Sequence, residues 1–130
     1  MANIPNELFY TKTHEWAKKI NQKVVIMGIT AHAQEQLRDI VFVELPSLGK
    51  ELKAGAACAV VESVKAAYDI FSPLSGKVVK ANQKIQEKPQ LVNEDPYGEG
   101  WFLHIEMSDP NELSALLNPA QYQAISEPAP

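Results

Sequence analysis

The chain has one cysteine, Cys58, among its 130 residues, so it cannot form an internal disulfide. It contains no stretch near the ~20 consecutive apolar residues of a membrane-spanning helix. Its first ten residues have neither the basic nor the apolar region of a signal peptide. We therefore expect a cytoplasmic protein that does not enter a membrane. The apolar neighbours of Cys58 favour a buried core residue over a nucleophile.

Basic clusters and metal-ligand patterns are also missing. The 12 lysines and arginines are outnumbered by 16 acidic residues, which gives a formal net charge of −4. This charge repels a phosphate backbone, and no cluster of lysine or arginine offsets it, so we expect no nucleic-acid binding. The three histidines do not have the spacing of metal ligands, so we expect no metal site.

The residues that are present predict one mainly β domain with short helices. The length and the 45% apolar content suit a single core. Period-two patterns predict strands over 22–28, 39–45 and 101–107. The second of these strands should place Val41, Val43 and Leu45 on one face. The third should bury the alternate face, formed by Trp101, Leu103, Ile105 and Met107.

Helix signals occur at three places. Thr30 is a predicted N-cap of a helix that ends near residue 37. Asp109, Pro110 and Glu112 have the arrangement of a capping box and predict a helix start. Asn118 and Pro119 repeat this start signal. We expect two short helices there, followed by a loose tail over 126–130.

A cryptic repeat occupies the middle of the chain. PSLGKELKAG at 46–55 and PLSGKVVKAN at 73–82 share the pattern P-x-x-G-K-x-x-K-A. Two copies are too few for a solenoid, which needs about three units or more. The pair instead predicts two facing units with two-fold symmetry that form a small flattened barrel of antiparallel strands. The segment between the copies contains a predicted hairpin whose tip is VKAA.

Lys65 stands alone in that tip, within VVESVKAAYDIFSP at 60–73. Most exposed lysines serve only to solvate the surface, and that interpretation is open here too. However, small alanines follow Lys65, and Glu62 and Asp69 frame it without a second lysine nearby. An ε-amine is protonated at neutral pH, so acylating it requires an enzyme with an activated acyl donor. The pattern fits an amine presented for modification.

Seven blocks of the sequence, in order and spread over most of the chain, resemble glycine cleavage system H proteins. They are HEW at 14–16, GIT at 28–30, AQEQL at 33–37, DIVFVELP at 39–46, VVESVKAA at 60–67, SPLSG at 72–76 and LVNEDPYGEGW at 91–101. The resemblance implies a barrel-sandwich hybrid fold, the flattened β-barrel of lipoyl and biotinyl domains, with an N-terminal extension and C-terminal helices. It implies one domain over 1–130, with the hairpin-bearing barrel at about 22–107 and the helices at about 109–126.

The resemblance also implies a carrier without catalytic residues of its own. Lys65 takes the place of the lipoylated lysine, so the implied cofactor is covalent lipoate. Glu62, Val64, Ala66 and Asp69 match the residues that surround this lysine in the family, so the resemblance implies that the lipoylation enzymes recognise them. The enzyme that attaches the cofactor would be a lipoyl or octanoyl ligase or transferase.

In this family the carrier shuttles an aminomethyl group from the pyridoxal-phosphate enzyme glycine decarboxylase to a tetrahydrofolate-dependent aminomethyltransferase. It then passes electrons to dihydrolipoamide dehydrogenase. The resemblance implies these partners, a bacterial cytoplasmic location and a monomer. It also implies that Glu15 holds the ammonium of the loaded arm in a cleft, where water is excluded. The alternative for Glu15 is a solvated surface glutamate.

Three positions depart from the family pattern. Gln36 replaces a histidine that some members have, while Arg38 and Tyr68 replace small residues. Tyr68 could pack beside the arm or alter how the ligase docks, and the sequence leaves both open.

Other functions remain as alternatives. An H-like relay that supplies lipoate to other complexes would need the same lysine. Biotin carriers and lipoyl domains of 2-oxoacid dehydrogenases fit less well, because the neighbours of the lysine are Val64 and Ala66. A thiol enzyme built on Cys58, His104 and a carboxylate has no support from spacing.

Overall fold

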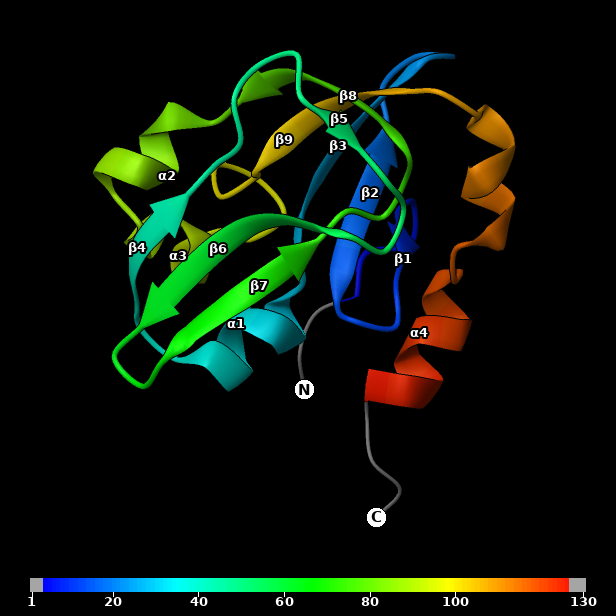
Figure 1. The fold of residues 1–130 in the computed structure, drawn as a ribbon. Coiled ribbons are helices and arrows are strands. Elements are labelled where there is room, and N and C mark those ends of the chain that lie inside the picture. Colours follow the sequence, from blue (N-terminus) through cyan, green and yellow to red (C-terminus); the bar gives the residue numbers. More distant parts are fainter. Residues whose placement is uncertain (1–3, 127–130) are drawn as a thin grey trace.

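The computed structural model describes residues 4–126, and β-strands make up the larger part of its regular secondary structure (Figure 1). The strands are β1 (Phe9–Tyr10), β2 (Glu15–Lys19), β3 (Val24–Ile29), β4 (Ile40–Glu44), β5 (Glu51–Leu52), β6 (Ala57–Ser63), β7 (Ala67–Phe71), β8 (Gly76–Ala81) and β9 (Leu103–Met107). The helices are α1 (Ala31–Leu37), α2 (Gln83–Glu87), α3 (Gln90–Glu94), the 3₁₀ helix η1 (Pro110–Ala115) and α4 (Pro119–Ser126). None of the helices in this part of the chain is long and apolar enough to span a membrane.

The strands form two sheets. The larger sheet has the order β1-β2-β3-β9-β8-β5, and the smaller has the order β4-β6-β7. All of their pairings are antiparallel. This arrangement confirms the predicted mainly β fold with short helices. It also shows that β1 and β2, which period-two reading missed, belong to the larger sheet.

The two copies of the sequence repeat pair with each other. Glu51 of β5 lies opposite Lys77 of β8, and Leu52 lies opposite Gly76, in antiparallel register. Gly49 and Gly55 both have positive φ, near 85° and 83°, a conformation that glycine adopts without steric cost. Antiparallel pairing is the relation expected between two units that face one another.

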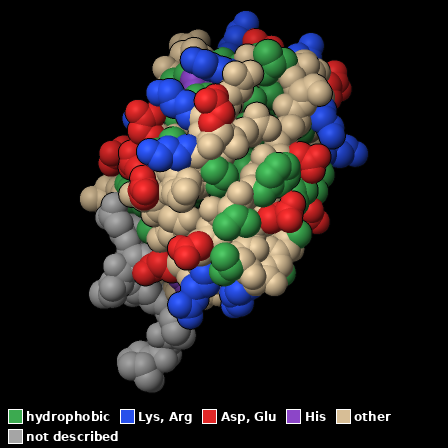
Figure 2. All heavy atoms as spheres, turned by 90° about the vertical axis from the view of Figure 1, so that its left-hand side faces the viewer, with side chains coloured by type: hydrophobic (Ala, Val, Ile, Leu, Met, Phe, Trp, Pro, Cys, Tyr) green, Lys and Arg blue, Asp and Glu red, His purple; other side chains and the backbone are tan. Residues whose placement is uncertain are grey.

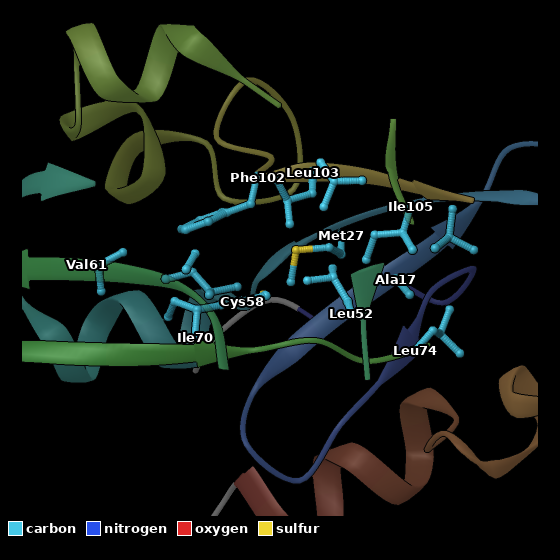
Figure 3. Packing of buried hydrophobic residues seen from close by; sticks show 14 of the residues in the cluster. Ala17, Met27, Leu52, Cys58, Val61, Ile70, Leu74, Phe102, Leu103 and Ile105 are labelled. Atoms are coloured by element: carbon cyan, nitrogen blue, oxygen red, sulfur yellow. The ribbon is translucent and has the colours of Figure 1, made fainter. Parts of the chain in front are cut away.

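The larger of two hydrophobic clusters joins the two sheets (Figure 3). Val61 and Ile70 reach it from the smaller sheet, and Met27 and Ile105 reach it from the larger. Cys58 is buried in the same core, as predicted, and burial raises the pKa of its thiol to about 12. Its thiol is therefore held protonated at neutral pH and is a poor nucleophile.

The prediction that Val41 and Val43 lie on the same face of β4 is wrong. Val41 is 55% exposed, whereas Ile40 and Val43 are buried. The cause is a β-bulge between Ile40 and Phe42, which breaks the alternation of side chains along the strand. Val41 and Phe42 consequently both lie outside the core.

In β9 the predicted apolar face is buried at Leu103, Ile105 and Met107. Phe102 was expected on the opposite face, and this was wrong because its side chain is fully buried. The residue lies before β9 begins, outside the regular alternation, and its backbone N–H donates to the carbonyl of Met27 at 2.8 Å.

The N-cap residue was predicted correctly at all three helix starts. The hydroxyl of Thr30 accepts from the N–H of Ala33, and Asn118 and Gln121 bond each other through side chain and backbone. At the third start Asp109 caps a 3₁₀ helix, and the expected capping box is absent. The Glu112 carboxylate instead accepts from the backbone N–H and hydroxyl of Ser75. The predicted tail lies outside the described residues, apart from Ser126, which ends α4.

Candidate functional site

Lys65 lies at the tip of the β6–β7 hairpin, at the lower left of Figure 1. The strands are in register up to the pair Glu62 and Ala67, and the turn consists of Val64, Lys65 and Ala66. The Lys65 side chain is exposed. The predicted hairpin with its tip at VKAA is confirmed.

The turn is held by a serine hydroxyl. The Ser63 Oγ accepts from the backbone N–H of Lys65 at 3.1 Å and of Ala66 at 3.4 Å. The N–H of Ser63 donates to the carbonyl of Ala66 at 2.9 Å, and the N–H of Val64 donates to the carbonyl of Asp39 at 3.1 Å. These bonds fix the backbone of Lys65 within the turn and tie the turn to the start of β4.

A cleft of about 320 Å³ opens beside the hairpin, and both Lys65 and Glu15 line it. Its walls come from β7, from α1 and from the loop that precedes β2. Apolar side chains form one part of the lining, namely Ile29, Ala33, Leu37 and Ile70. The remaining lining residues are Thr13, His14, Gln36, Tyr68 and Asp69. The cleft could therefore hold a long apolar chain that ends in a polar or charged group.

Glu15 is only 1% exposed, so it is not a solvated surface glutamate. Its Oε1 accepts from the hydroxyl of Thr11 at 2.6 Å and from the hydroxyl of Thr13, and its Oε2 accepts from the N–H of Phe71 at 3.2 Å. Burial raises the pKa of Glu15, while these hydrogen bonds oppose the rise. The hydrogen bonds offset only part of the free energy that it costs to bury the charged carboxylate. A cation in the cleft can offset the rest, so such a carboxylate can bind a cation.

The residues predicted to surround Lys65 divide into two groups. Glu62, Val64 and Ala66 are exposed around the tip. Asp69 is also exposed, and it lines the cleft together with Lys65 and Glu15. The fold thus brings Lys65, Asp69 and Glu15 to one cavity, although Glu15 is 50 residues away from Lys65 in the sequence.

The three departures from the family pattern also lie near the tip. Gln36 and Tyr68 line the cleft, and Tyr68 is half-buried and packs against the core. Arg38 ends α1 with φ 69° and ψ −153°, a conformation that is almost confined to glycine. Arg38 also lines a separate hollow beside Lys65, together with Gln36.

The sequence did not reveal how α4 contacts the wall of the cleft. The Tyr122 hydroxyl lies 2.8 Å from Nδ1 of His14 and 2.7 Å from Oγ1 of Thr30. The Tyr122 ring stacks on Tyr10, with the ring centroids 4.6 Å apart. Burial lowers the pKa of His14, and the adjacent His32 lowers it further. These contacts hold the His14–Glu15 segment against α4.

Other site residues were missed as well. Thr11 and Thr13 precede Glu15 by four and two residues, a spacing that could have indicated side-chain hydrogen bonds to the glutamate. The role of Ser63 follows the known tendency of serine to bond backbone N–H groups two or three residues ahead. No local signal pointed to the N–H of Phe71 or to Tyr122.

The alternative of a thiol enzyme has no geometric support. Cys58 lies in the core, whereas His104 is on the outer face of β9, with its ring centroid 4.6 Å from that of Trp101. Within residues 4–126, no three histidine, cysteine or acidic side chains are grouped so that they could hold a metal ion.

The fold and the exposed lysine at a hairpin tip define a protein of the lipoyl-domain class, with a barrel-sandwich architecture. Within that class, the family model "Glycine cleavage H-protein" matches residues 8–129. The chain is 50% identical over 127 residues to a glycine cleavage system H protein of Xylella fastidiosa, which covers 98% of this chain and 97% of that protein. It is 52% identical over 125 residues to one from a Shewanella species, covering 96% and 97%.

A solved structure agrees with these matches. The crystal structure of a glycine cleavage system H protein from Mycobacterium marinum superimposes with a TM-score of 0.86 at 35% sequence identity, covering 93% of this chain and 97% of that chain. The chain therefore belongs to the glycine cleavage H-protein family, which is a family of carriers.

Proposed function

We propose that the protein is the lipoyl-bearing carrier of a bacterial glycine cleavage system, with lipoate attached to the ε-amine of Lys65. In this proposal the whole chain, 1–130, is one carrier domain without catalytic turnover of its own. It acts as a monomer in the bacterial cytoplasm and carries an aminomethyl group from glycine decarboxylase to the aminomethyltransferase. It then delivers electrons to dihydrolipoamide dehydrogenase.

One observation carries the proposal, namely that Lys65 and the buried Glu15 line the same cleft. An arm attached to Lys65 can extend into solvent or fold back into this cleft. The apolar lining, including Ile29, Leu37 and Ile70, suits a hydrocarbon chain. The amine is exposed on a turn fixed by Ser63, which suits attachment by another enzyme.

When bound, the lipoyl group supplies a dithiolane that accepts two electrons and a carbon group. The residues of the chain do the rest. Lys65 anchors the arm, and the hairpin positions that anchor relative to the cleft. The Glu15 carboxylate pairs with an ammonium at the end of the arm, and the residues that bury this carboxylate exclude water from the pair. Asp69 adds a second negative charge along the cleft.

The test is to incubate the purified chain with a lipoate–protein ligase, ATP and lipoate, and to measure its intact mass. We expect one lipoyl addition, located on Lys65 by peptide mapping. Lys65→Arg should take up no lipoyl group, while Lys23→Arg, which changes an exposed lysine just before β3, should be modified normally. Acylation of Lys65→Arg, or no acylation of the unaltered chain, would refute the proposal.

The modified protein should then support glycine decarboxylation by the partner enzymes, and Lys65→Ala should not. Far-ultraviolet circular dichroism of Lys65→Ala should match that of the unaltered chain, because the side chain lies outside the core. Full support of decarboxylation by Lys65→Ala would rule out a carrier role for this lysine.

A further inference from the structure

The block LVNEDPYGEGW at 91–101 takes no part in the lining of the cleft that contains Lys65 and Glu15. It consists of α3 from Leu91 onward and the loop that leads towards β9. Its side chains and carbonyl groups nevertheless reach α1 at both ends and β2 next to Glu15. Segment 91–101 therefore contacts the elements that form the cleft without facing the cleft itself.

Tyr97 accepts a hydrogen bond at the start of α1. The N–H of Ala31, the first residue of the helix, donates to the Tyr97 hydroxyl at 3.0 Å. In the same turn the N–H of Ala33 donates to the hydroxyl of Thr30. The N–H groups of a first helical turn have no acceptor within the helix, so these two side chains replace it. Tyr97 is the acceptor that comes from another part of the chain.

Asn93 makes three hydrogen bonds where α1 ends. Its Nδ2 donates to Oε1 of Gln34 at 3.0 Å and to the carbonyl of Arg38 at 2.8 Å. Its Oδ1 accepts from the N–H of Ile40 at 2.9 Å. Arg38 has a positive φ of 69°, which costs free energy for a residue with a side chain, so this backbone depends on neighbouring contacts. Asn93 supplies such contacts from α3.

The same segment also holds the strand that bears Glu15. The indole N–H of Trp16, the residue after Glu15, donates to the carbonyl of Pro96 at 3.0 Å. Trp16 is only 1% exposed, and its ring lies so close to Gly28 of β3 that a Cβ atom there would come within 2.9 Å of the ring. Two adjacent residues, Pro96 and Tyr97, thus connect β2 with α1. The position of α1 relative to Glu15 depends on this connection.

Hydrogen bonds within the loop fix its own shape. The carbonyl of Asp95 accepts from the N–H of Gly98 at 3.1 Å and from that of Gly100 at 2.9 Å. The Asn82 side chain donates to two further carbonyls of the loop, each at 2.8 Å. A Cβ atom at Gly100 would lie 2.7 Å from the carbonyl oxygen of Leu91, so glycine is required there. A loop held in this way can transmit a fixed position to α1.

Helix α1 needs support from outside. It has seven residues, and an isolated helix of that length is not stable in water. Only Leu37 of this helix is buried, so packing against the core anchors it at one end only. Ala33, Gln36 and Leu37 belong to the lining of the cleft. A shift of α1 would therefore admit water to the cleft.

A docking surface is the alternative role for segment 91–101, since Glu94, Asp95 and Glu99 are exposed acidic residues. Figure 2 shows the side of the molecule that bears α2 and α3, and basic and acidic side chains are interspersed there. Glu99 pairs with Lys84 at 3.7 Å, and the Asp95 carboxylate accepts from the N–H of Glu99 at 2.9 Å. These two acidic groups already have partners nearby, so the contacts favour a supporting role.

We propose that segment 91–101 is a clamp for α1, and that Asn93 and Tyr97 are positioning residues that keep α1 against the cleft and water away from the end of the loaded arm. The inference rests on the proposed function and deepens it, because the arm is the one attached to Lys65. Neither positioning residue touches the arm, since neither lines the cleft. Each of them acts through α1.

The first test is amide hydrogen exchange of the unmodified chain. Tyr97→Phe removes the acceptor for Ala31, and Asn93→Asp removes both donated bonds while keeping the acceptor oxygen. We expect exchange in α1 to accelerate by about threefold or more in each variant, as for the loss of one or more hydrogen bonds, while β8 and β9 stay unchanged. Tyr10→Phe is the matched control, because it removes a hydrogen bond to the carbonyl of Pro5. The two variants are independent, so the test remains decisive if one of them does not fold.

The second test follows the carboxyl carbon of Glu15 by nuclear magnetic resonance during a pH titration of the unmodified chain. Burial raises the pKa of Glu15, so water admitted by a displaced α1 should lower this pKa towards the ordinary glutamate value of about 4.3. The negative charge added by Asn93→Asp would raise the pKa, so a fall in that variant cannot come from the added charge. Tyr10→Phe should leave the pKa of Glu15 unchanged.

The third test measures ammonia release from carriers that have been acylated and then loaded by glycine decarboxylase. We expect release to be about threefold or more faster in Tyr97→Phe and Asn93→Asp than in the unaltered chain, and within about twofold of it in Tyr10→Phe. Unchanged exchange in α1 would overturn the clamp. Faster exchange with an unchanged Glu15 pKa and unchanged ammonia release would overturn its role in protecting the arm. If the unaltered chain is not acylated, the proposed function fails, and the first two tests still decide whether segment 91–101 holds α1 against the cleft.

Discussion

The N–H of Phe71 donates a 3.2 Å hydrogen bond to Oε2 of Glu15. Phe71 ends β7, the strand that leads away from the Lys65 turn, and Glu15 begins β2 in the other sheet. The bond therefore joins the hairpin to the carboxylate that we propose as the partner of the arm. The bond holds the hairpin that bears Lys65 and the Glu15 carboxylate in a fixed relative position. An arm on Lys65 that folds back to Glu15 requires such a fixed position.

Glu15→Gln should speed the loss of ammonia from the loaded carrier. A hydrogen bond between charged groups contributes about 1.5–3 kcal/mol, so we expect a rate increase of roughly tenfold or more. The measurement is ammonia release over time from protein loaded by glycine decarboxylase. Glu112→Gln serves as the control, because Glu112 also accepts hydrogen bonds but contacts Ser75 outside the cleft. Equal rates in both variants would exclude a protective role for Glu15.

Glu15 should also give the unfolding free energy a distinctive pH dependence. Burial raises its pKa in the folded state, so the fold binds a proton more tightly than the unfolded chain does. The resulting stability is fully present below the unfolded pKa and is lost as pH rises through the folded pKa. Denaturant unfolding from about pH 4 to 7 should therefore show the stability of the unaltered chain falling relative to Glu15→Gln. A difference that stays constant with pH would contradict the raised pKa.

Arg38→Gly should stabilise the protein. Arg38 has φ 69° and ψ −153°, and such a conformation costs a residue with a side chain about 1–3 kcal/mol. Glycine removes this strain but gives the unfolded chain about 0.5–1 kcal/mol more entropy, so the net gain should be about 1 kcal/mol. Thermal unfolding should show a rise of a few degrees in Tm. Arg38→Ala keeps the strain and should show no rise, so an equal gain in both variants would assign the effect to the side chain.

Tyr122→Phe should destabilise the fold by about 1–3 kcal/mol, because it leaves the buried Thr30 hydroxyl and His14 Nδ1 without a shared partner. Stacking on Tyr10 should persist, since the ring remains. Chemical denaturation will measure the change. Tyr68→Phe is the control, because no hydrogen bond of its hydroxyl is present in the described part of the chain. Tyr68→Phe should change the free energy of unfolding by less than about 0.5 kcal/mol. If both variants lost the same stability, the hydrogen bonds of the Tyr122 hydroxyl would not be the cause.

The hairpin at Lys65 could be predicted because its cause is local. Two β-forming runs flank a short turn, and a repeat on either side marks the boundaries. The caps at Thr30 and Asn118 were predictable for the same reason, since each depends on residues within one helical turn. Local chemistry determined these elements, and the sequence displays local chemistry directly.

The features that the sequence did not predict depend on contacts between segments that are distant in the chain. The bulge that exposes Val41 depends on how β4 pairs with β6, which no period within 39–45 reveals. Glu112 would have closed a capping box, but Ser75 offers it two donors from another part of the chain. Strand β1 was missed because it has only two residues, and β2 was missed because its burial does not alternate: its first three residues are buried and its last two are exposed. The burial of Glu15 likewise results from tertiary contacts. The family resemblance implied that Glu15 lies in a cleft, but the local sequence pattern did not.

The hydrogen bonds that hold the Lys65 turn come from Ser63 and from backbone groups. Among residues 4–126 none of these bonds, and no ion pair, uses the ammonium of Lys65. The proposed acylation would neutralise that ammonium without breaking any of these bonds, so we expect the unmodified and the modified protein to have the same shape. Unmodified chains would occupy the docking sites of partner enzymes without delivering anything, so flux would depend on the acylated fraction as well as on the total amount of protein.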